Sequence, residues 1–409
     1  MRRAISITEA LETTLGFIPS TAPEFVSLVD LVGRMPTSDL YAKVNSPSVD
    51  ASLKDGYAVR SADVADAGPG NPITLQLAGH ITAGQKTGIT LKTGQTFRIT
   101  TGSPIPEGAD AVLSEEYASL DGQHVICRNT AESGRNVLAR GTDIRKGECV
   151  ARQGEKITPA TAGLITTAGL DGAHVYKRPR VCVIATGDEV VAPGLPLPEG
   201  KLYASNVIEI CAWLQHFGVG FQIAFAQDRP KEIAALIREH LCAADAFITS
   251  GGIWGSERDL MLHVLEGLNW QGCYHRVRMA PGKAVAFGLL ENKPFFCLPG
   301  GPPSNEMAFL QIALPGLLRM SGGRFPPFPL MAATLTADVF GDDTWTQFIH
   351  AQLEKDSGGW RVTPLRQKSR LRSMACKNAL IMLPEGCGYL AGGASITVQV
   401  LDSEVLCSA

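Results

Sequence analysis

The chain has 409 residues and a mass of 43.5 kDa, which indicates two to four domains at about 150 residues per domain. Hydrophobic residues make up 45% and charged residues 19%, with a net charge of −3, so global disorder and a general nucleic-acid footprint are excluded. The 43 glycines and 25 prolines indicate many tight turns and exclude a helical bundle, a coiled coil and a fibre.

The first part of the chain is predicted to be helical, with a β-rich insertion. Ser6–Glu9 has the pattern of a capping box before apolar residues at helical spacing. A second helical stretch is expected near Leu28–Val32, and a third over Thr158–Ala168, which has a proline in its first turn. Between them, short β-type runs are separated by Gly, Pro, Asn and Asp, at Ile73–Leu77, Phe97–Thr101, Ala111–Leu113 and His124–Cys127.

From Val181 onward, strands and helices are predicted to alternate. Val181–Ala185 is a continuous apolar run, typical of a strand covered on both faces. Further strands are expected at Val219–Ala226, Ala246–Thr249, Lys283–Gly288 and Pro294–Leu298, and helices at Asn206–Phe217, Pro230–Leu241, Asp259–Leu268 and Ser304–Ser321. This alternation predicts an open, mostly parallel α/β sheet. Beyond the linker at 322–329, Met331–Leu406 is predicted to form a small β domain.

The fold class is therefore multidomain α/β plus β. We expect a helical domain formed by 1–46 and 144–178, interrupted by a β insert at 47–143. The α/β domain is expected at 179–325 and the C-terminal β domain at 326–409.

Composition also bears on location and metal binding. The N-terminus lacks the unbroken apolar core of a signal peptide, and the chain has no run of about 18 apolar residues, so we expect a cytoplasmic protein without a membrane span. The ten cysteines contain no CxxC spacing and are expected to be reduced. The eight histidines show no metal-ligand spacing, so a zinc site is not expected.

Three strands of the predicted sheet run into loops suited to an anionic ligand. The loops are Thr186–Glu189, Ser250–Gly252 and Pro299–Ser304. Glycine lets backbone amides approach an anion closely, and ligands bind beyond the carboxyl ends of parallel strands. The carboxylate pair Asp188 and Glu189 suggests a magnesium ion that bridges to phosphate. Together the three loops predict a phosphate-bearing ligand, although Walker A and GxGxxG patterns are absent.

The order of short motifs over most of the chain resembles the molybdopterin molybdenumtransferase family (the MoeA type, which includes the E domain of gephyrin). The motifs that carry this resemblance are Asp55-Gly56-Tyr57-Ala58-Val59-Arg60, Arg98–Val112, Gly141-Thr142-Asp143-Ile144, Thr186-Gly187-Asp188-Glu189, Ser205-Asn206, Ser250-Gly251-Gly252, Pro281-Gly282-Lys283 and Leu298-Pro299-Gly300.

The resemblance implies an elongated homodimer whose cleft lies between the α/β domain of one subunit and the β insert of the other. It implies that adenylylated molybdopterin and molybdate are the substrates, that Mg2+ is required, and that AMP is released. It also implies a pterin nucleotide and an oxyanion as binding partners, possible contacts with other cofactor-biosynthesis proteins or a recipient molybdoenzyme, and neither nucleic acid nor membrane as a partner.

Residue roles follow from the matching positions. The resemblance implies catalytic roles for Asp188, Glu189, Asp228, Asp259 and Lys283, with Asp188 and Glu189 also near the metal. It implies cofactor-binding roles for Asp55, Thr101, Asp143, Ser250, Gly251, Gly252, Gly300 and Ser304. Alternatives stay open for some residues. Asp228 could cap the helix near Pro230. The basic run Arg366–Arg372 is more typical of a solvated face, although the resemblance implies that this region borders the cleft.

The chain also departs from the family pattern around the anion pocket. Trp254 replaces a serine, Ala280 a lysine, Gly301 an asparagine and Lys54 a methionine. Removing a charge-assisted hydrogen bond from such a pocket costs about 1.5–3 kcal/mol. The alternative hypothesis is therefore a catalytically impaired relative that binds molybdopterin or the finished cofactor as a carrier for a molybdoenzyme. Whether Trp254 stacks on a ligand or blocks it stays open.

Overall fold

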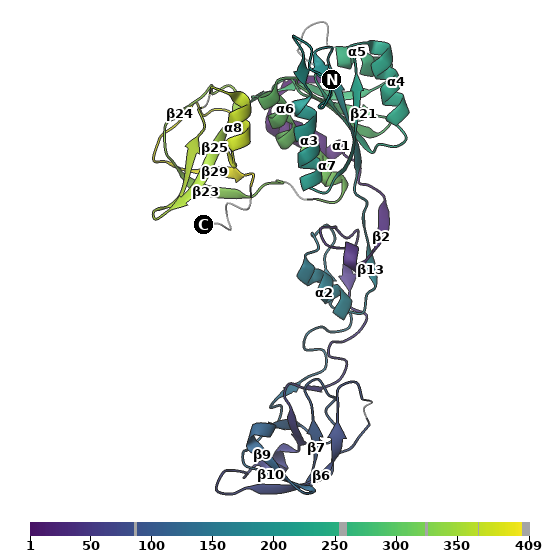
Figure 1. The fold of residues 1–409 in the computed structure, drawn as a ribbon, viewed down its shortest axis with the longest axis vertical. Helices are drawn as coiled ribbons and strands as arrows, with labels where there is room; N and C mark the ends of the chain where they lie inside the picture. The colour runs from purple at the N-terminus through teal and green to yellow at the C-terminus, as the bar shows by residue number, and fades with distance from the viewer. Residues whose placement is uncertain (86–87, 253–259, 324–325, 367, 403–409) are drawn as a thin grey trace. The chain divides into compact units, whose positions relative to one another are not determined.

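The structure is a computed structural model that describes residues 1–85, 88–252, 260–323, 326–366 and 368–402. It divides into two compact units (Figure 1). One unit comprises Met1–Glu24 and Tyr176–Ala409, and the other comprises Phe25–Val175.

A sheet of seven described strands forms the centre of the first unit. In spatial order the strands are β1 (Arg2–Ile5), β19 (Gln271–Val277), β21 (Ala286–Leu290), β22 (Lys293–Leu298), β18 (Ala246–Ser250), β14 (Arg180–Thr186) and β17 (Gly220–Ala226). The pairs β1–β19, β22–β18, β18–β14 and β14–β17 are parallel. Strand β21 is antiparallel to both of its neighbours.

Helices cover both faces of this sheet (Figure 1). Val181 and Val183 of β14 point to the face covered by α1 (Ile7–Phe17), α3 (Ser205–His216), α6 (Pro302–Ala308) and α7 (Leu314–Met320). Cys182 and Ile184 point to the other face, which carries α4 (Pro230–His240) and α5 (Leu260–Gly267). A turn of π-helix, Phe309–Ala313, joins α6 to α7. Because both faces are covered, β14 is apolar almost throughout.

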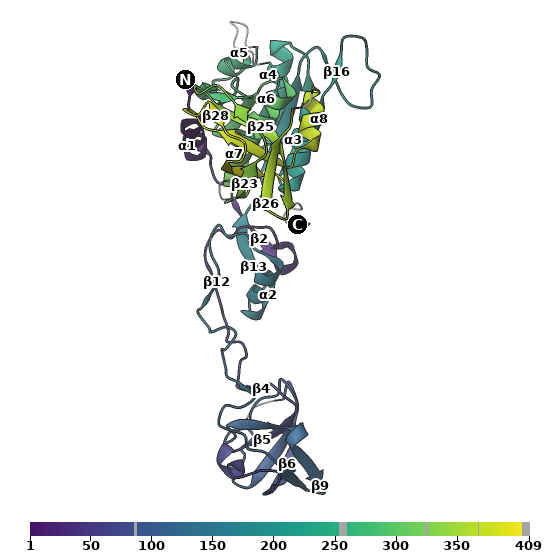
Figure 2. The ribbon, with the colours of Figure 1, turned by 90° about the vertical axis from the view of Figure 1, so that its left-hand side faces the viewer.

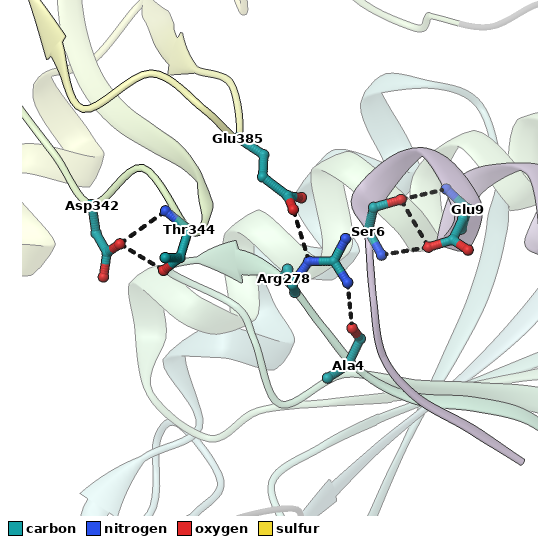
Figure 3. Close-up of polar contacts among 7 residues, drawn as sticks. All are labelled: Ala4, Ser6, Glu9, Arg278, Asp342, Thr344 and Glu385. Carbon is teal, nitrogen blue, oxygen red and sulfur yellow. Dashed lines mark hydrogen bonds and ion pairs between the residues drawn. The ribbon is translucent and has the colours of Figure 1, made fainter.

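The N-terminal residues belong to this sheet, which differs from the predicted grouping of 1–46 with 144–178. Strand β1 pairs with β19, with Ile5 beside Val277, and the Arg278 guanidinium donates to the Ala4 carbonyl at 2.8 Å (Figure 3). The predicted capping box is present, because Ser6 and Glu9 exchange hydrogen bonds at the start of α1. Pairing across more than 260 residues leaves no local signal in the sequence, so the sequence pattern does not reveal this first strand.

The C-terminal part of the first unit is a closed β-barrel. Its strands form a ring in the order β25 (Thr346–Asp356), β26 (Gly359–Pro364), β23 (Leu330–Leu335), β29 (Ser395–Val400) and β27 (Ala379–Leu383), closed by pairing of β25 with β27. Strand β20 (Met279–Ala280) extends from the α/β body to pair with β25. Helix α8 (Arg370–Cys376), capped by the Ser369 hydroxyl, is not anticipated by the sequence within this β region.

The Phe25–Val175 unit contains a six-stranded sheet and the helix α2 (Pro159–Thr167). The sheet order is β8 (Ala111–Ser114), β5 (Gly56–Val59), β7 (Gln95–Ile99), β6 (Ile73–Ile81), β10 (His124–Cys127) and β9 (Ala118–Asp121). The four β-runs predicted here are thus strands. Helix α2 starts as predicted, with the Thr158 hydroxyl as its cap. The stretch predicted as helical near Leu28–Val32 is instead a single 3-10 turn, Leu28–Asp30.

Short strand pairs complete the described structure. They are β2 (Pro23–Ser27) with β13 (Gly172–Tyr176), β3 (Leu40–Tyr41) with β12 (Cys149–Ala151), β4 (Ala51–Ser52) with β11 (Val137–Leu138), β15 (Val190–Val191) with β16 (Leu202–Tyr203), and β24 (Val339–Phe340) with β28 (Tyr389–Leu390). Within the described ranges, no helix combines the length and apolar character needed to cross a membrane. The described cysteines are all free thiols.

Candidate functional site

Four parallel strands of the seven-stranded sheet have their carboxyl ends on the same side of the sheet. In the parallel register, Thr186 at the end of β14 lies beside Ala226 of β17, and Ser250 at the end of β18 lies beside Leu298 of β22. Ser250 also lies beside Ala185 on its other side. The loops that follow these strands are therefore neighbours, as the sequence predicted for three of them.

The glycines of these loops permit a close approach of the backbone. The Gly251 amide donates to the Leu298 carbonyl at 3.1 Å, and its φ is +102°. A Cβ atom placed on Gly251 would lie 2.8 Å from the Thr186 carbonyl oxygen, so the position requires glycine. A Cβ atom on Gly300 would lie 3.7 Å from the Gly251 Cα. The loops after β18 and β22 are thus in backbone contact.

Two asparagines fix these loops in place. Asn206 on α3 donates from Nδ2 to the Gly300 carbonyl at 2.8 Å and to the Ser250 hydroxyl at 3.2 Å. Asn305 on α6 donates to the same hydroxyl at 3.0 Å and to the Pro299 carbonyl at 2.8 Å. Because Ser250 Oγ accepts from two amides, its own proton is left for another acceptor. The role of both asparagines was not predicted, although Asn206 lies in one of the motifs.

A cavity of about 400 Å3 opens above these loops. Thr186 forms part of its wall, and the Thr186 hydroxyl is buried without a hydrogen-bond partner among the described residues. An unsatisfied buried hydroxyl is costly, and this one stands behind the cavity wall with almost no surface open to the cavity. The other lining residues come from the segment between β14 and the loop after β18, from the loop after β22 and the start of α6, and from α8. They are Ala185, Glu189, Val190, Leu202, Tyr203, Ala204, Ser205, Asn206, Val207, Ser250, Gly251, Gly300, Pro302, Arg370 and Leu371.

The acidic residues after β14 and β17 gather at this edge. The Asp228 amide donates to Asp188 Oδ1 at 3.2 Å. Burial raises the pKa of Asp228, a hydrogen bond from the Asp188 backbone amide opposes this effect, and the negative charges of Asp188 and Glu189 raise the pKa further. Gly187 suits this turn because its φ is +134°, and the Glu189 carboxylate folds back to within 2.7 Å of where a Cβ on Gly187 would lie. Asp228 does not cap α4, whose N-cap residue is Arg229.

These three carboxyl groups supply the hard oxygen ligands that Mg2+ prefers, and their mutual repulsion would be relieved by a cation. Across the described ranges, however, no group of three or more His, Cys, Asp or Glu side chains is already arranged to hold a metal. Asp259 and Trp254, which the sequence also placed here, lie outside the described residues.

Lys283 does not line the cavity. Its ammonium lies 6.0 Å from the centre of the Trp345 ring, a cation–π contact with the C-terminal barrel. Its loop still packs beside α6, because a Cβ on Gly282 would lie 3.2 Å from the Ser304 carbonyl. The cation that does reach the cavity is Arg370 of α8, which the sequence had favoured as part of a solvated face.

The remaining predicted residues lie in the Phe25–Val175 unit. Asp55 Oδ1 accepts from the Thr101 amide at 2.6 Å and from the Thr101 hydroxyl at 2.9 Å, and these hydrogen bonds lower the pKa of Asp55. Asp143 is held through its backbone, which donates to the Ser46 carbonyl at 3.0 Å. The structure therefore brings Asp55 and Thr101 together and places Asp143 on a different loop.

Three family models match successive parts of the chain. Residues 5–169 match the MoeA N-terminal region (domain I and II), residues 182–319 match a probable molybdopterin binding domain, and residues 332–401 match the MoeA C-terminal region (domain IV).

Two relatives of similar length are both named molybdopterin molybdenumtransferase. The chain is 31% identical over 400 residues to molybdopterin molybdenumtransferase 2 of Mycobacterium tuberculosis, covering 96% of this chain and 98% of that one. It is 30% identical over 408 residues to molybdopterin molybdenumtransferase of Bacillus subtilis, covering 98% and 94%.

Solved structures show the same architecture. A molybdopterin biosynthesis MoeA protein from Pyrococcus horikoshii superposes with a TM-score of 0.86 at 29% identity, covering 98% of this chain and 99% of that one. A second MoeA structure from that organism superposes with a TM-score of 0.81 at 24% identity, covering 97% of this chain and 100% of that one. From its sequence, its fold and the order of its domains, the chain belongs to the molybdopterin molybdenumtransferase family of the MoeA type.

Proposed function

We propose that the protein inserts molybdate into adenylylated molybdopterin and releases AMP, as a step of molybdenum cofactor biosynthesis. The observation that carries this proposal is the cavity at the strand ends, with its contacting glycine loops and the Ser250 hydroxyl. Glu189 and Arg370 both line this cavity, and Asp188 and Asp228 lie close to Glu189, which suits a phosphate that is held together with a metal ion. Relatives named molybdenumtransferase over nearly the whole chain do not favour the alternative of an inactive carrier.

The residues of the cavity would divide the work between binding and charge stabilisation. The Gly251 and Gly300 loops bring backbone close to the phosphate. Ser250 supplies a hydroxyl donor, and Arg370 supplies positive charge. Each donor holds phosphate oxygens in a fixed orientation, which lowers the entropic part of the barrier when an oxygen nucleophile such as water attacks phosphorus and the phosphoanhydride bond to AMP breaks.

Asp188, Glu189 and Asp228 are the residues that would hold Mg2+. When bound, Mg2+ supplies positive charge beside the phosphate oxygens as negative charge builds up on the departing AMP. The residues themselves orient that charge: Asp228 is fixed by its amide contact to Asp188, and Gly187 lets Glu189 fold back toward the strand end.

We further propose that the protein acts as a homodimer in the cytoplasm. On this proposal, the partner subunit's β insert contributes the Asp55 and Thr101 pair and Asp143 to the site. The domain expected at 1–46 and 144–178 forms the dimer contacts, apart from residues 1–24, which belong to the unit of the α/β sheet. The domain boundaries at 47–143, 179–325 and 326–409 remain part of this proposal. Other cofactor-biosynthesis proteins, or a recipient molybdoenzyme, would bind the assembled dimer.

The direct test follows AMP release from adenylylated molybdopterin with molybdate and magnesium. Wild-type protein should release AMP, and Glu189→Gln should lower the rate at least tenfold, because it removes a negative charge beside the cation. Glu199→Gln is the matched control, since Glu199 is exposed on the loop after β15 and does not line the cavity. Absence of AMP release with retained pterin binding would favour the carrier alternative.

A further inference from the structure

A second cavity, of about 660 Å3, lies between α3 and α8. On α3 it is lined by residues at helical spacing, Ser205, Ile208, Glu209 and Ala212. Facing them on α8 are Leu371, Met374 and Ala375, and the loop residues Pro193, Gly194 and Tyr203 complete the lining. Figure 2 shows that loop, which carries β16, extending from the body beside α8.

This second cavity continues into the first. Tyr203, Ser205 and Leu371 line both of them. A ligand with an anionic group at the glycine loops therefore has a path for its remainder between α3 and α8. All of these elements belong to the same compact unit.

The walls of the second cavity are mainly apolar, and several of the side chains remain accessible. Ile208 is 47% exposed, Leu371 52% and Tyr203 44%. Exposed apolar side chains gathered around a hollow are typical of a ligand site. A flat ring could cover both the α3 wall and the α8 wall, because the aliphatic side chains face each other across the cavity.

Glu209 is the one acidic side chain among the described lining residues, and it contacts a buried group of charged side chains. Its carboxyl group hydrogen-bonds to that of Glu306 on α6. Glu306 has no exposed side-chain surface; it forms an ion pair with Lys377 and lies 2.9 Å from His350 Nε2 on β25. With Lys377 and His350 on its other sides, Glu306 is the charged member of the carboxyl pair.

Glu209 keeps its proton as a result. Burial and then the charge of Glu306 raise the pKa of Glu209 to about 8. With its O–H shared with Glu306, the Glu209 carboxyl is a neutral group in the cavity lining, and its other oxygen is left to accept a hydrogen bond. A neutral acceptor pairs with an N–H donor and does not repel a ligand that is anionic elsewhere.

We propose that the cavity between α3 and α8 binds the flat nitrogen heterocycle of the substrate, with Glu209 accepting a hydrogen bond from an amino or ring N–H of that heterocycle. This inference rests on the proposed function, because the heterocycle belongs to the nucleotide whose phosphate occupies the glycine loops. Both the pterin and the adenine of the substrate present such a donor edge, so the experiment has to distinguish them.

The test measures binding of two probes to the full-length protein. The fluorescent pterin-6-carboxylate is titrated directly, and adenosine is measured by calorimetry. Glu209→Ala should weaken the bound probe about tenfold, which corresponds to the loss of a hydrogen bond of about 1.4 kcal/mol. Ala212→Trp should weaken it further by filling an exposed part of the wall, and Ala212→Ser is the matched control.

Weakened pterin binding in both variants would assign the cavity to the pterin, and weakened adenosine binding would assign it to the adenine. Failure of both probes to bind wild-type protein at millimolar concentration, or binding that is unchanged by Ala212→Trp, would overturn the inference. AMP release is followed separately. Loss of probe binding in the variants of a protein that releases no AMP would leave this inference standing while the proposed function fails.

Discussion

Replacing Lys377 by methionine should strongly destabilise the unit that contains the α/β sheet and the barrel. Lys377 is 6% exposed and forms an ion pair with Glu306, whose side chain is fully buried. Lys377 also donates to the Met374 carbonyl at 2.8 Å. Removing one partner of a buried ion pair costs about 3–5 kcal/mol, because the other charge remains in an apolar environment. For a unit of this size, that destabilisation lowers the melting temperature by about 6–20 °C.

The sign of the pH dependence follows from the same interactions. In the wild type, His350 and Lys377 hold the pKa of Glu306 below its usual value against the effect of burial, so Glu306 contributes stability that is lost as the pH falls through that lowered value. Without Lys377 the pKa of Glu306 should rise, and the variant should be least stable, relative to wild type, at alkaline pH. Calorimetric melting at pH 5 and pH 8 measures this difference.

A double variant provides the control. Glu306→Leu combined with Lys377→Met removes both charges together, and an apolar replacement of a buried pair is close to neutral. It should therefore recover most of the stability that the single variant lacks. A Lys377→Met protein that melts within about 2 °C of wild type at pH 8 would refute the reasoning, because the pair would then contribute no net stability.

Three further predictions concern the two cavities. Glu209→Gln should be more stable than wild type at pH 9 and equal to it at pH 4. The pKa of the Glu209 carboxyl in the folded protein is raised to about 8, so the stability that this group contributes at low pH is lost as the pH rises through that value. Melting temperatures at the two pH values test this prediction. Arg370→Ala should weaken AMP binding about tenfold by calorimetry and lower its salt dependence, whereas Arg372→Ala, outside the cavity lining, should leave both unchanged. Gly251→Ala should abolish AMP binding, because the added Cβ would lie 2.8 Å from the Thr186 carbonyl oxygen and the φ of Gly251 is +102°. Gly267→Ala is the control: a Cβ at Gly267 has no atom within 4 Å, so this variant should bind AMP as wild type does.

The sheet edge was predictable because its signals are local. Val181–Ala185 is apolar throughout, as a strand buried on both faces must be, and glycines follow it and two neighbouring strands. Strand β1 had no such signal: its first three residues are exposed, and it exists because β19 pairs with it. Helix α8 was hidden in a similar way, since seven residues within a β region carry little helical periodicity.

The lining of the site was only partly predictable. Spacing from a glycine loop can place backbone near a ligand, but it does not give the direction of a long side chain. The loop of Lys283 therefore packs near the site, but the Lys283 ammonium points to the Trp345 ring. The sequence analysis did not single out Glu209 or Glu306, because the lysine and histidine that pair with Glu306 come from the C-terminal part of the chain, more than 40 residues later.

The pairing of β1 with β19 has a consequence for how the chain folds. Residues 25–175 are inserted between the first strand and helix of the α/β body and the rest of that body. During synthesis, β1 and α1 must wait until residues beyond 277 emerge before their partners exist. A fragment starting at 176 would leave β19 as an exposed sheet edge and uncover the apolar surface beneath α1. Such a fragment should aggregate unless residues 1–24 are supplied as a separate peptide or fused to it through a short linker.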